Sequence, residues 1–90
     1  MKDVTYKSWK WYVYVLECLD GFYYTGLTWN LEKRLEEHKS GKGSKFTEKH
    51  GFKKLRYSEE FTNLLQARTR EIQIKDFSRK KKEALFTYSK

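Results

Sequence analysis

The sequence predicts one small α+β domain in which a three-stranded, mostly antiparallel sheet is flanked by helices, in the order β-β-α-β-α-α. Three observations lead to this prediction. An aromatic and β-branched run folds back through a tight turn, helical patterns with capping residues follow it, and no proline interrupts either kind of segment. Ninety residues leave room for a single core. Helices layered on one small antiparallel sheet are the architecture that such a pattern favours.

The N-terminal hairpin is the clearest local signal. Residues 11–18 are rich in Trp, Tyr and Val, which is typical of a strand. Asp20 and Gly21 follow, a pair that suits the positive φ angles of a tight hairpin turn. Residues 22–26 are aromatic again and end at a glycine. The prediction is therefore two antiparallel strands joined at Asp20 and Gly21.

A helix and a long loop are predicted next. Asn30 can cap a helix through its side-chain oxygen, and apolar residues at helical spacing carry this helix to about residue 40. Gly41 is suited to end it. Residues 41–54 are rich in Gly and Lys and are predicted as a loop.

The rest of the chain is predicted as a strand followed by two helices. Residues 55–61 alternate well enough for a third strand. Thr62 resembles an N-cap that opens a helix over residues 63–77, and a short final helix spans 78–86. The boundaries that follow are a polar N-terminal arm at 1–10, a folded domain at 11–86 and a C-terminal tail at 87–90.

The charge balance points to a polyanionic partner. Twenty Lys and Arg residues against twelve Asp and Glu residues leave a net charge of +8 and a calculated pI near 9.6. Such a field attracts nucleic acid or an acidic membrane surface, and a merely soluble basic surface is the plain alternative. No apolar run approaches the roughly 18 residues that a membrane span needs, so no span is expected.

The cysteine content bears on cellular location. Cys18 is the one cysteine, so no internal disulfide can form. No apolar secretory segment is visible in residues 1–10. Both observations favour the cytoplasm. The oligomeric state stays open, with a monomer slightly favoured.

Five polar side chains form the candidate catalytic set. Tyr14 and Tyr24 fall on the two hairpin strands, although alternation does not fix whether the two phenols share a face. Arg34 and His38 are four residues apart on the first predicted helix and so share one face, and Glu71 lies on the later helix. A phosphodiesterase needs a proton acceptor, a cation for the phosphate and a carboxylate for a metal. Individually, each residue also has an ordinary explanation in aromatic packing, a solvated helix face or a surface ion pair.

Taken together, these residues resemble the GIY-YIG nucleases, whose relatives include the nuclease domains of excision-repair and intron-homing endonucleases. Residues 12–14 and, ten positions on, residues 24–26 are similar to the two short motifs that name the family. The helix that carries Arg34 and the later helix that carries Glu71 look like its third and fourth hallmarks. The resemblance covers residues 11–86 in order, which is much more specific than any one triplet. Further likeness to the small stand-alone branch lies in residues 41–45 and 80–85.

The chain departs from the family pattern at three positions. Tyr12 stands where the first motif has Gly, and Thr25 stands where the second has Ile. Leu27 occupies a place where repair-type relatives tend to carry a lysine, which suggests weaker or different chemistry. Gly26 closes the second motif, and we expect it to allow close packing of the strand end against a helix.

The resemblance implies a one-metal hydrolysis of a phosphodiester that leaves a 5′-phosphate and a 3′-hydroxyl. Glu71 would hold one Mg²⁺ or Mn²⁺ ion, with water filling most other positions. Arg34 would grip the scissile phosphate. Tyr14 or Tyr24 would orient or deprotonate the attacking water, which requires neighbouring cations to lower the pKa of a phenol. His38 would hydrogen-bond to a tyrosine or to the phosphate.

Binding has its own expected residues. Cations that cluster in the Lys-rich loop and near the C-terminus would contact phosphates without reading sequence. Aromatic side chains at 9, 11, 29 and 46 are candidates for stacking on unpaired bases, with core packing as the alternative for each. The predicted phosphate contacts are Lys42, Lys45, Lys49, Lys53, Lys54, Lys75, Arg79 and Lys80.

The leading functional prediction is a metal-dependent DNA endonuclease with little sequence specificity, acting in repair or recombination. One alternative is a nucleic-acid-binding module that keeps the fold and cuts poorly or not at all. Another is a subunit of a larger repair assembly that supplies the missing specificity. Whether the substrate is DNA or RNA, and duplex, single-stranded or branched, stays open at this point.

Overall fold

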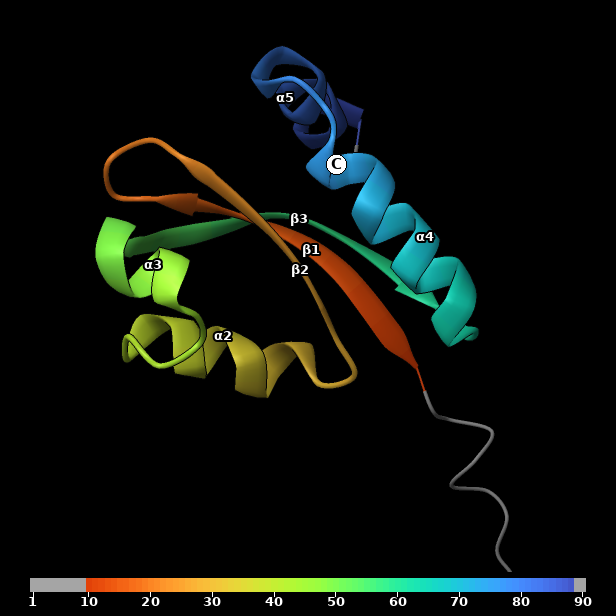
Figure 1. Ribbon diagram of the computed structural model, residues 1–90, viewed down its shortest axis with the longest axis horizontal. Coiled ribbons are helices and arrows are strands. Elements are labelled where there is room, and N and C mark those ends of the chain that lie inside the picture. Colours follow the sequence, from red (N-terminus) through yellow and green to blue (C-terminus); the bar gives the residue numbers. More distant parts are fainter. Residues whose placement is uncertain (1–9, 89–90) are drawn as a thin grey trace, which may run out of the picture.

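The computed structural model describes residues 10–88 of the 90-residue chain, so all of the predicted N-terminal arm except its last residue lies outside the described residues. Two strands open the described chain, two helices separate them from a third strand, and two helices close it (Figure 1). The elements are β1 (Trp11–Cys18), β2 (Tyr23–Thr28), α2 (Leu31–Lys39), α3 (Lys45–His50), β3 (Phe52–Phe61), α4 (Leu64–Lys75) and α5 (Arg79–Tyr88).

The three strands form one antiparallel sheet in the order β2-β1-β3, which confirms the predicted fold class. β1 is the central strand, and its register with β2 pairs Tyr14 with Gly26 and Leu16 with Tyr24. The turn between them is the predicted one. Gly21 adopts a φ of 94°, and the Asp20 carboxylate accepts a hydrogen bond from the Phe22 N–H at 3.3 Å.

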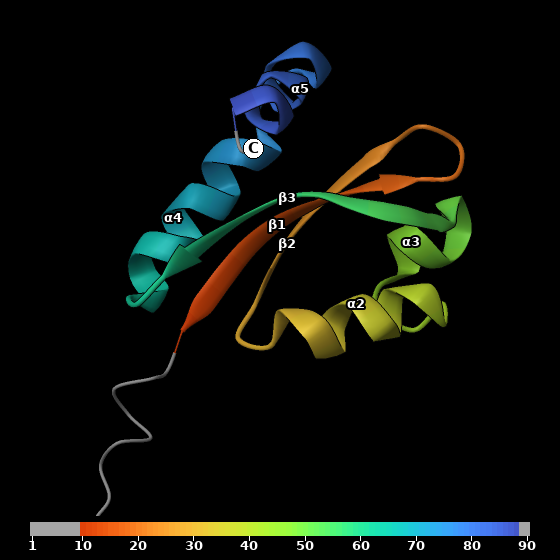
Figure 2. The same cartoon turned by 180° about the vertical axis from the view of Figure 1, so that it is seen from behind.

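Helices cover both faces of this sheet. α2 and α3 lie on one face, and α4 and α5 lie on the other (Figures 1 and 2). Val13 and Val15 of β1 point to the second face, where they are fully buried in a cluster with Ala67, Ile74 and Phe86. Because side chains alternate along a strand, the residue between the two valines points to the other face, towards α2.

The segment at 41–54, predicted as a loop, instead contains a helix and the start of a strand. Ser44 caps α3 by accepting a hydrogen bond from the Thr47 N–H at 3.1 Å, and Gly51 ends it with a φ of 79°. β3 then begins at Phe52, three residues before the predicted start. A helix of only six residues has too few turns for a periodic pattern, so capping and packing decide its presence.

The C-terminal helices differ from their predicted limits by a few residues. Asn63, and not Thr62, caps α4, because the Asn63 side chain accepts a hydrogen bond from the Gln66 N–H at 3.0 Å. α5 extends two residues beyond the predicted end at 86. None of the helices within residues 10–88 has both the length and the apolar character needed to cross a membrane.

Candidate active site

Tyr14 is the residue around which the site is built. It lies on the central strand and is fully buried. Its partner across the strand pair is Gly26, on the edge strand β2. A Cβ atom at position 26 would lie 2.4 Å from the Tyr14 hydroxyl, so a glycine is needed for the phenol to lie across β2. Gly26 therefore makes room for the Tyr14 ring, whereas the sequence predicts close packing against a helix at this position.

The second tyrosine shares this face of the sheet, a question that the sequence left open. The strand register places Tyr24 two residues along β2 from the glycine opposite Tyr14, so both phenols point towards α2. The ring centroids of Tyr14 and Tyr24 are 6.3 Å apart. The His38 ring lies 5.7 Å from the first and 5.3 Å from the second, both edge-on. Three rings from three elements thus pack together.

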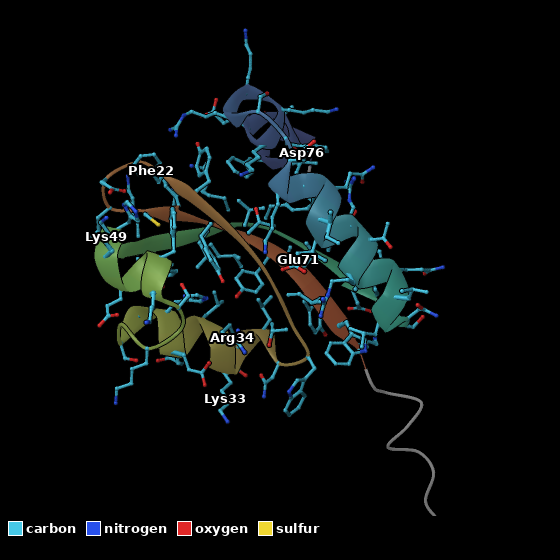
Figure 3. The ribbon with its side chains drawn as sticks, viewed as in Figure 1. Phe22, Lys33, Arg34, Lys49, Glu71 and Asp76 are labelled. Carbon is cyan, nitrogen blue, oxygen red and sulfur yellow. The ribbon has the colours of Figure 1, made fainter. Side chains whose placement is uncertain are left out.

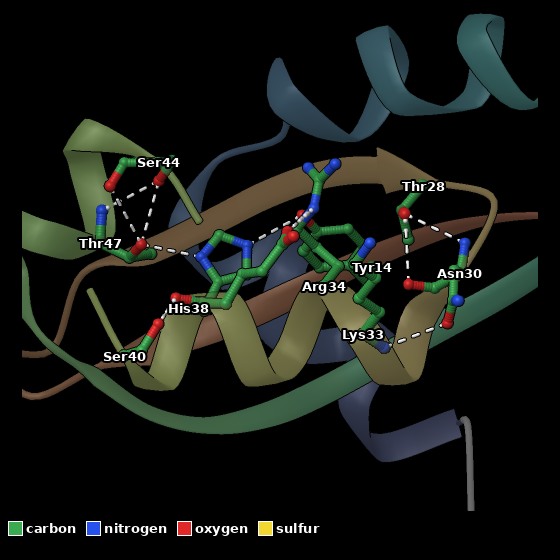
Figure 4. Close-up of polar contacts among 10 residues, drawn as sticks. Tyr14, Thr28, Asn30, Lys33, Arg34, His38, Ser40, Ser44 and Thr47 are labelled. Carbon is green, nitrogen blue, oxygen red and sulfur yellow. Dashed lines mark hydrogen bonds and ion pairs between the residues drawn. The ribbon is translucent and has the colours of Figure 1, made fainter. Parts of the chain in front are cut away.

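His38 links Tyr14 to a buried hydroxyl. Its side chain is 1% exposed, and its Nε2 atom lies 3.0 Å from the Tyr14 hydroxyl. Its Nδ1 atom lies 2.8 Å from the Thr47 Oγ1, which in turn lies 3.0 Å from the Ser44 Oγ (Figure 4). A Cβ atom at Gly43 would lie 2.4 Å from the same Nδ1. Both ring nitrogens therefore have a protein partner in a tight space.

Sequence reasoning missed three members of this arrangement. Gly43, Ser44 and Thr47 fall in the segment predicted as a loop, although Ser44 followed by Thr47 has the spacing of a helix N-cap and its partner. That spacing was the one available signal. It indicates a cap but does not indicate that the threonine hydroxyl meets a histidine nine residues earlier in the chain.

Two charged side chains approach the sheet from opposite helices. Figure 3 shows Arg34 extending from α2 and Glu71 extending from α4 towards the sheet between them. The Arg34 Nε lies 2.9 Å from a Glu37 carboxylate oxygen. The Glu71 side chain is 13% exposed and lies 3.2 Å from the Lys75 ammonium and 3.7 Å from the Arg68 guanidinium. The carboxylate is thus largely shielded from solvent and held among cations.

The pKa of Tyr14 depends on several of these groups. Burial raises the pKa of the Tyr14 phenol above its usual range, and the nearby Tyr24 adds to the rise. The Arg34 guanidinium opposes it, and the Glu71 carboxylate raises the pKa further. Burial prevails, so the phenol is protonated at neutral pH. The Arg34 guanidinium thus lowers the pKa of Tyr14, as a base role requires, but burial outweighs its effect.

The surroundings of His38 lower the pKa of its imidazole, whereas those of Tyr14 raise the pKa of the phenol. Burial lowers the pKa of His38, the Arg34 guanidinium lowers it as well, and Glu37 opposes them. The folded protein thus keeps this imidazole neutral, while the unfolded chain takes up a proton below about pH 6.5. Stability linked to this residue is present above that pH and is lost as the pH falls.

Acidification is therefore expected to destabilise the protein through His38. Between pH 7 and pH 5 the free energy of unfolding should fall, with a contribution from His38 of at most about 1.4 kcal/mol per pH unit. His38→Gln removes the titrating group and should flatten the slope, as measured by urea denaturation at fixed ionic strength. Equal slopes for the two proteins would contradict the lowered pKa.

Glu71 is the residue near Tyr14 whose chemistry suits a divalent metal. A carboxylate oxygen is a ligand that Mg²⁺ and Mn²⁺ prefer, and Mg²⁺ commonly keeps several waters beside one or two carboxylates. Within residues 10–88 no group of three or more His, Cys, Asp or Glu side chains is placed to hold an ion alone. The donor set therefore fits an ion held by one carboxylate, water and substrate, and does not fit an all-protein cage. Such an ion would displace Lys75 from the carboxylate.

The predicted phosphate contacts fall into two groups. Lys53 pairs with Glu17 at 3.4 Å, and Lys75 pairs with Glu71. Arg79 stacks on the Tyr23 ring and donates a hydrogen bond to the Gly21 carbonyl, which holds α5 against the hairpin. The remaining predicted contacts are exposed and have no ion pair within the described part of the chain; they are Lys42, Lys45, Lys49, Lys54 and Lys80.

These exposed cations do not all gather at one place. Lys42 lies between α2 and α3, and Lys45 and Lys49 lie on α3, on the side of the sheet that carries Arg34. Lys80 lies on α5, across the sheet. Lys42, Lys45 and Lys49 of the Lys-rich segment and the C-terminal Lys80 therefore lie on opposite faces of the sheet.

The fold and this arrangement of tyrosines, arginine, histidine and glutamate define a protein of the GIY-YIG family. The model of the GIY-YIG catalytic domain matches residues 10–84, and the chain belongs to that family. This confirms the resemblance seen in the sequence, and a nucleic-acid partner is what membership implies.

Within the family, the chain is similar to small UPF0213 proteins. It is 47% identical over 75 residues to UPF0213 protein VNG_2274C of Halobacterium salinarum, covering 83% of this chain and 97% of that protein. It is 46% identical over 76 residues to UPF0213 protein CPE1444 of Clostridium perfringens, covering 84% and 82%. The solution NMR structure of the UPF0213 protein BH0048 from Bacillus halodurans shares 42% identity and matches with a TM-score of 0.56 over 87% of this chain and 83% of that one.

Leu27 takes part in the core and not in the site. In the register of the hairpin it pairs with Val13, and it packs against the cluster beneath α4. The position at which repair-type relatives tend to carry a lysine therefore points to the face opposite the tyrosines in this chain.

Proposed function

We propose that the protein is a divalent-metal-dependent endonuclease that hydrolyses DNA phosphodiester bonds with little sequence specificity, in repair or recombination. The observation that carries this proposal is the convergence on one buried phenol. Tyr24, Arg34 and Glu71 each influence the pKa of Tyr14 electrostatically. The Tyr14 hydroxyl lies 3.0 Å from the His38 Nε2 atom. Two strands and two helices supply these groups, and ordinary surface ion pairs or aromatic packing would not require them to come together.

Proton transfer from the attacking water would pass through Tyr14 to His38. A protonated phenol can accept the water proton only as its own proton leaves, and the Nε2 atom of the neutral His38 is the acceptor 3.0 Å away. This direction requires the tautomer with its proton on Nδ1, which then donates to the Thr47 hydroxyl at 2.8 Å. Thr47 would therefore orient the imidazole and support the charge that His38 gains.

Arg34 would hold the scissile phosphate. Its guanidinium carries five N–H donors, and one hydrogen bond to Glu37 leaves donors for phosphate oxygens. Glu71 would hold the metal, which when bound would offset charge on the leaving oxygen. The exposed Lys42, Lys45 and Lys49 would draw the backbone towards this side of the sheet.

A second candidate is a nucleic-acid-binding module with little or no cleavage. The ion pairs of Glu71 with Lys75 and Arg68 favour it, because both cations compete with a metal for the carboxylate. In that case the basic surface would bind while the buried groups would serve the fold. The same chain acting as a subunit of a larger repair assembly would bind weakly until its partner is added.

Cleavage of a labelled panel of single-stranded, duplex, nicked and flap DNA at low salt tests the proposal. We expect cutting in Mg²⁺ or Mn²⁺ and none in EDTA, with 3′-hydroxyl ends. The same panel made of RNA defines the sugar preference. Binding across the panel without cutting in either metal would reject the nuclease and favour the binding module.

A further inference from the structure

Trp29 lies at the junction of β2 and α2, and its side chain lines two hollows in the surface. Trp29 is 51% exposed, which is unusual for so large an aromatic residue. The backbone on either side of it is held firmly. The Thr28 hydroxyl accepts a hydrogen bond from the Asn30 N–H at 3.1 Å, and the Asn30 side chain accepts one from the Lys33 N–H at 3.1 Å (Figure 4). The ring is thus presented from a rigid junction.

The first hollow beside the indole is mostly apolar. Its volume is about 460 Å³, which accommodates a nucleobase. Aromatic and aliphatic side chains supply most of the wall, with one carboxylate at the rim. The lining residues are Tyr12, Trp29, Asn30, Leu31, Glu32 and Leu35.

The second hollow is also lined by Trp29 and is polar. Its volume is about 80 Å³, too small for a base, and its lining includes Lys33 and Arg34. Arg34 is the proposed phosphate-binding residue, and Lys33 is an exposed cation one position before it (Figure 3). Glu37 also lines this hollow, and its carboxylate is already paired with Arg34 at 2.9 Å. An anionic phosphate in this hollow would lie near two cations, Lys33 and Arg34. The charge of Arg34 is partly neutralised by Glu37.

Of the aromatic side chains considered for stacking, Trp29 is the one that the structure presents beside the phosphate-binding residue. Trp11 packs against the core cluster. The Phe46 ring packs on Tyr24 and His50, at centroid distances of 5.7 and 4.3 Å. Trp9 lies outside the described residues.

We infer that Trp29 forms a subsite for one unpaired nucleotide next to the scissile phosphate. The base stacks on the indole and fills the apolar hollow, and its phosphate lies against Lys33 and Arg34. A base in a duplex keeps both its faces stacked and cannot do this, so the subsite selects single strands, flaps or frayed ends. The position of the subsite rests on the proposed role of Arg34, but its existence does not depend on cleavage.

The test is binding in EDTA, where no metal-dependent cleavage occurs. Fluorescence anisotropy compares three labelled ligands of equal length: oligothymidylate, an oligonucleotide of abasic residues, and a blunt duplex. Trp29→Ala is expected to weaken binding of oligothymidylate about 5- to 150-fold, since stacking on an aromatic side chain contributes about 1–3 kcal/mol per base. Binding of the abasic strand and of the duplex should change by less than about twofold.

Two further variants guard the interpretation. Trp29→Phe keeps an aromatic face and should recover most of the lost affinity, which a general folding defect would not allow. Leu65→Ala removes another exposed apolar side chain, 75% exposed on α4, and should leave all three affinities unchanged.

Several results would overturn the inference. These are an unchanged affinity of Trp29→Ala for oligothymidylate, an equal loss with the abasic strand, or wild-type binding of the abasic strand as tight as that of oligothymidylate. None of these binding results depends on cleavage. If Trp29 contributes to base binding but no DNA is cut, the nuclease proposal is rejected and the subsite stands. If DNA is cut but Trp29 does not contribute to base binding, the subsite is rejected and the nuclease proposal stands.

Discussion

Glu71→Gln is expected to abolish metal-dependent cleavage, lowering its rate by about 10³-fold or more, while binding in EDTA survives. The amide has nearly the shape of the carboxylate but lacks the charge that holds a divalent cation, and a metal contributes several kcal/mol to the transition state. The change also frees Lys75 and Arg68 from their anionic partner. Affinity for nucleic acid should therefore stay the same or rise. Single-turnover cleavage and anisotropy measure the two effects separately.

The matched control is Glu36→Gln on α2. Glu36 is 71% exposed in its side chain and pairs only with Lys39 within the described chain, at 3.4 Å. It undergoes the same loss of charge away from Tyr14, so its cleavage rate should match the wild type. Cleavage by Glu71→Gln within about tenfold of the wild-type rate would mean that the metal is held elsewhere.

Arg34→Lys is expected to lower the cleavage rate by about 10²- to 10³-fold although the positive charge remains. A guanidinium presents a planar fork of donors that matches a phosphate, whereas an ammonium is a compact point charge. Arg34 must also keep its contact with Glu37 while it holds the phosphate, which one ammonium group does less well. Measured at saturating protein, the loss should appear in the rate constant and not in the dissociation constant.

Lys39→Arg serves as the control for this charge-conserving exchange. Lys39 lies on the same helix and is 55% exposed in its side chain, so both rate and affinity should be unchanged. Comparable thermal stability of the two variants would exclude a folding defect. An Arg34→Lys protein that cuts at the wild-type rate would show that the charge suffices and the fork does not matter.

The position of Tyr14 explains how so small a domain can gather a site. The phenol belongs to the central strand but crosses the edge strand at Gly26, so charged groups from both layers of helices influence its pKa. Arg34 comes from one layer and Glu71 from the other (Figure 3). A side chain at position 26 would block the crossing and separate these groups.

Much of this was predictable because it depends on residues close in sequence. The hairpin turn at Asp20 and Gly21 and the cap at Asn30 follow from local backbone preferences. The placement of Arg34 and His38 on one helix follows from their spacing. The net charge of +8 needs no structure at all.

Only the tertiary structure decided which of these side chains meet. The register of the sheet put Tyr14 and Tyr24 on one face, and the packing of a short helix brought the Thr47 hydroxyl to His38. Packing likewise placed the Arg79 side chain against the Gly21 carbonyl, where it holds α5 to the hairpin. It also left Trp29 exposed in the hollow that Arg34 lines. Composition and spacing specify local conformation and overall charge, whereas contacts between distant residues depend on register and on how helices pack, which no local pattern encodes.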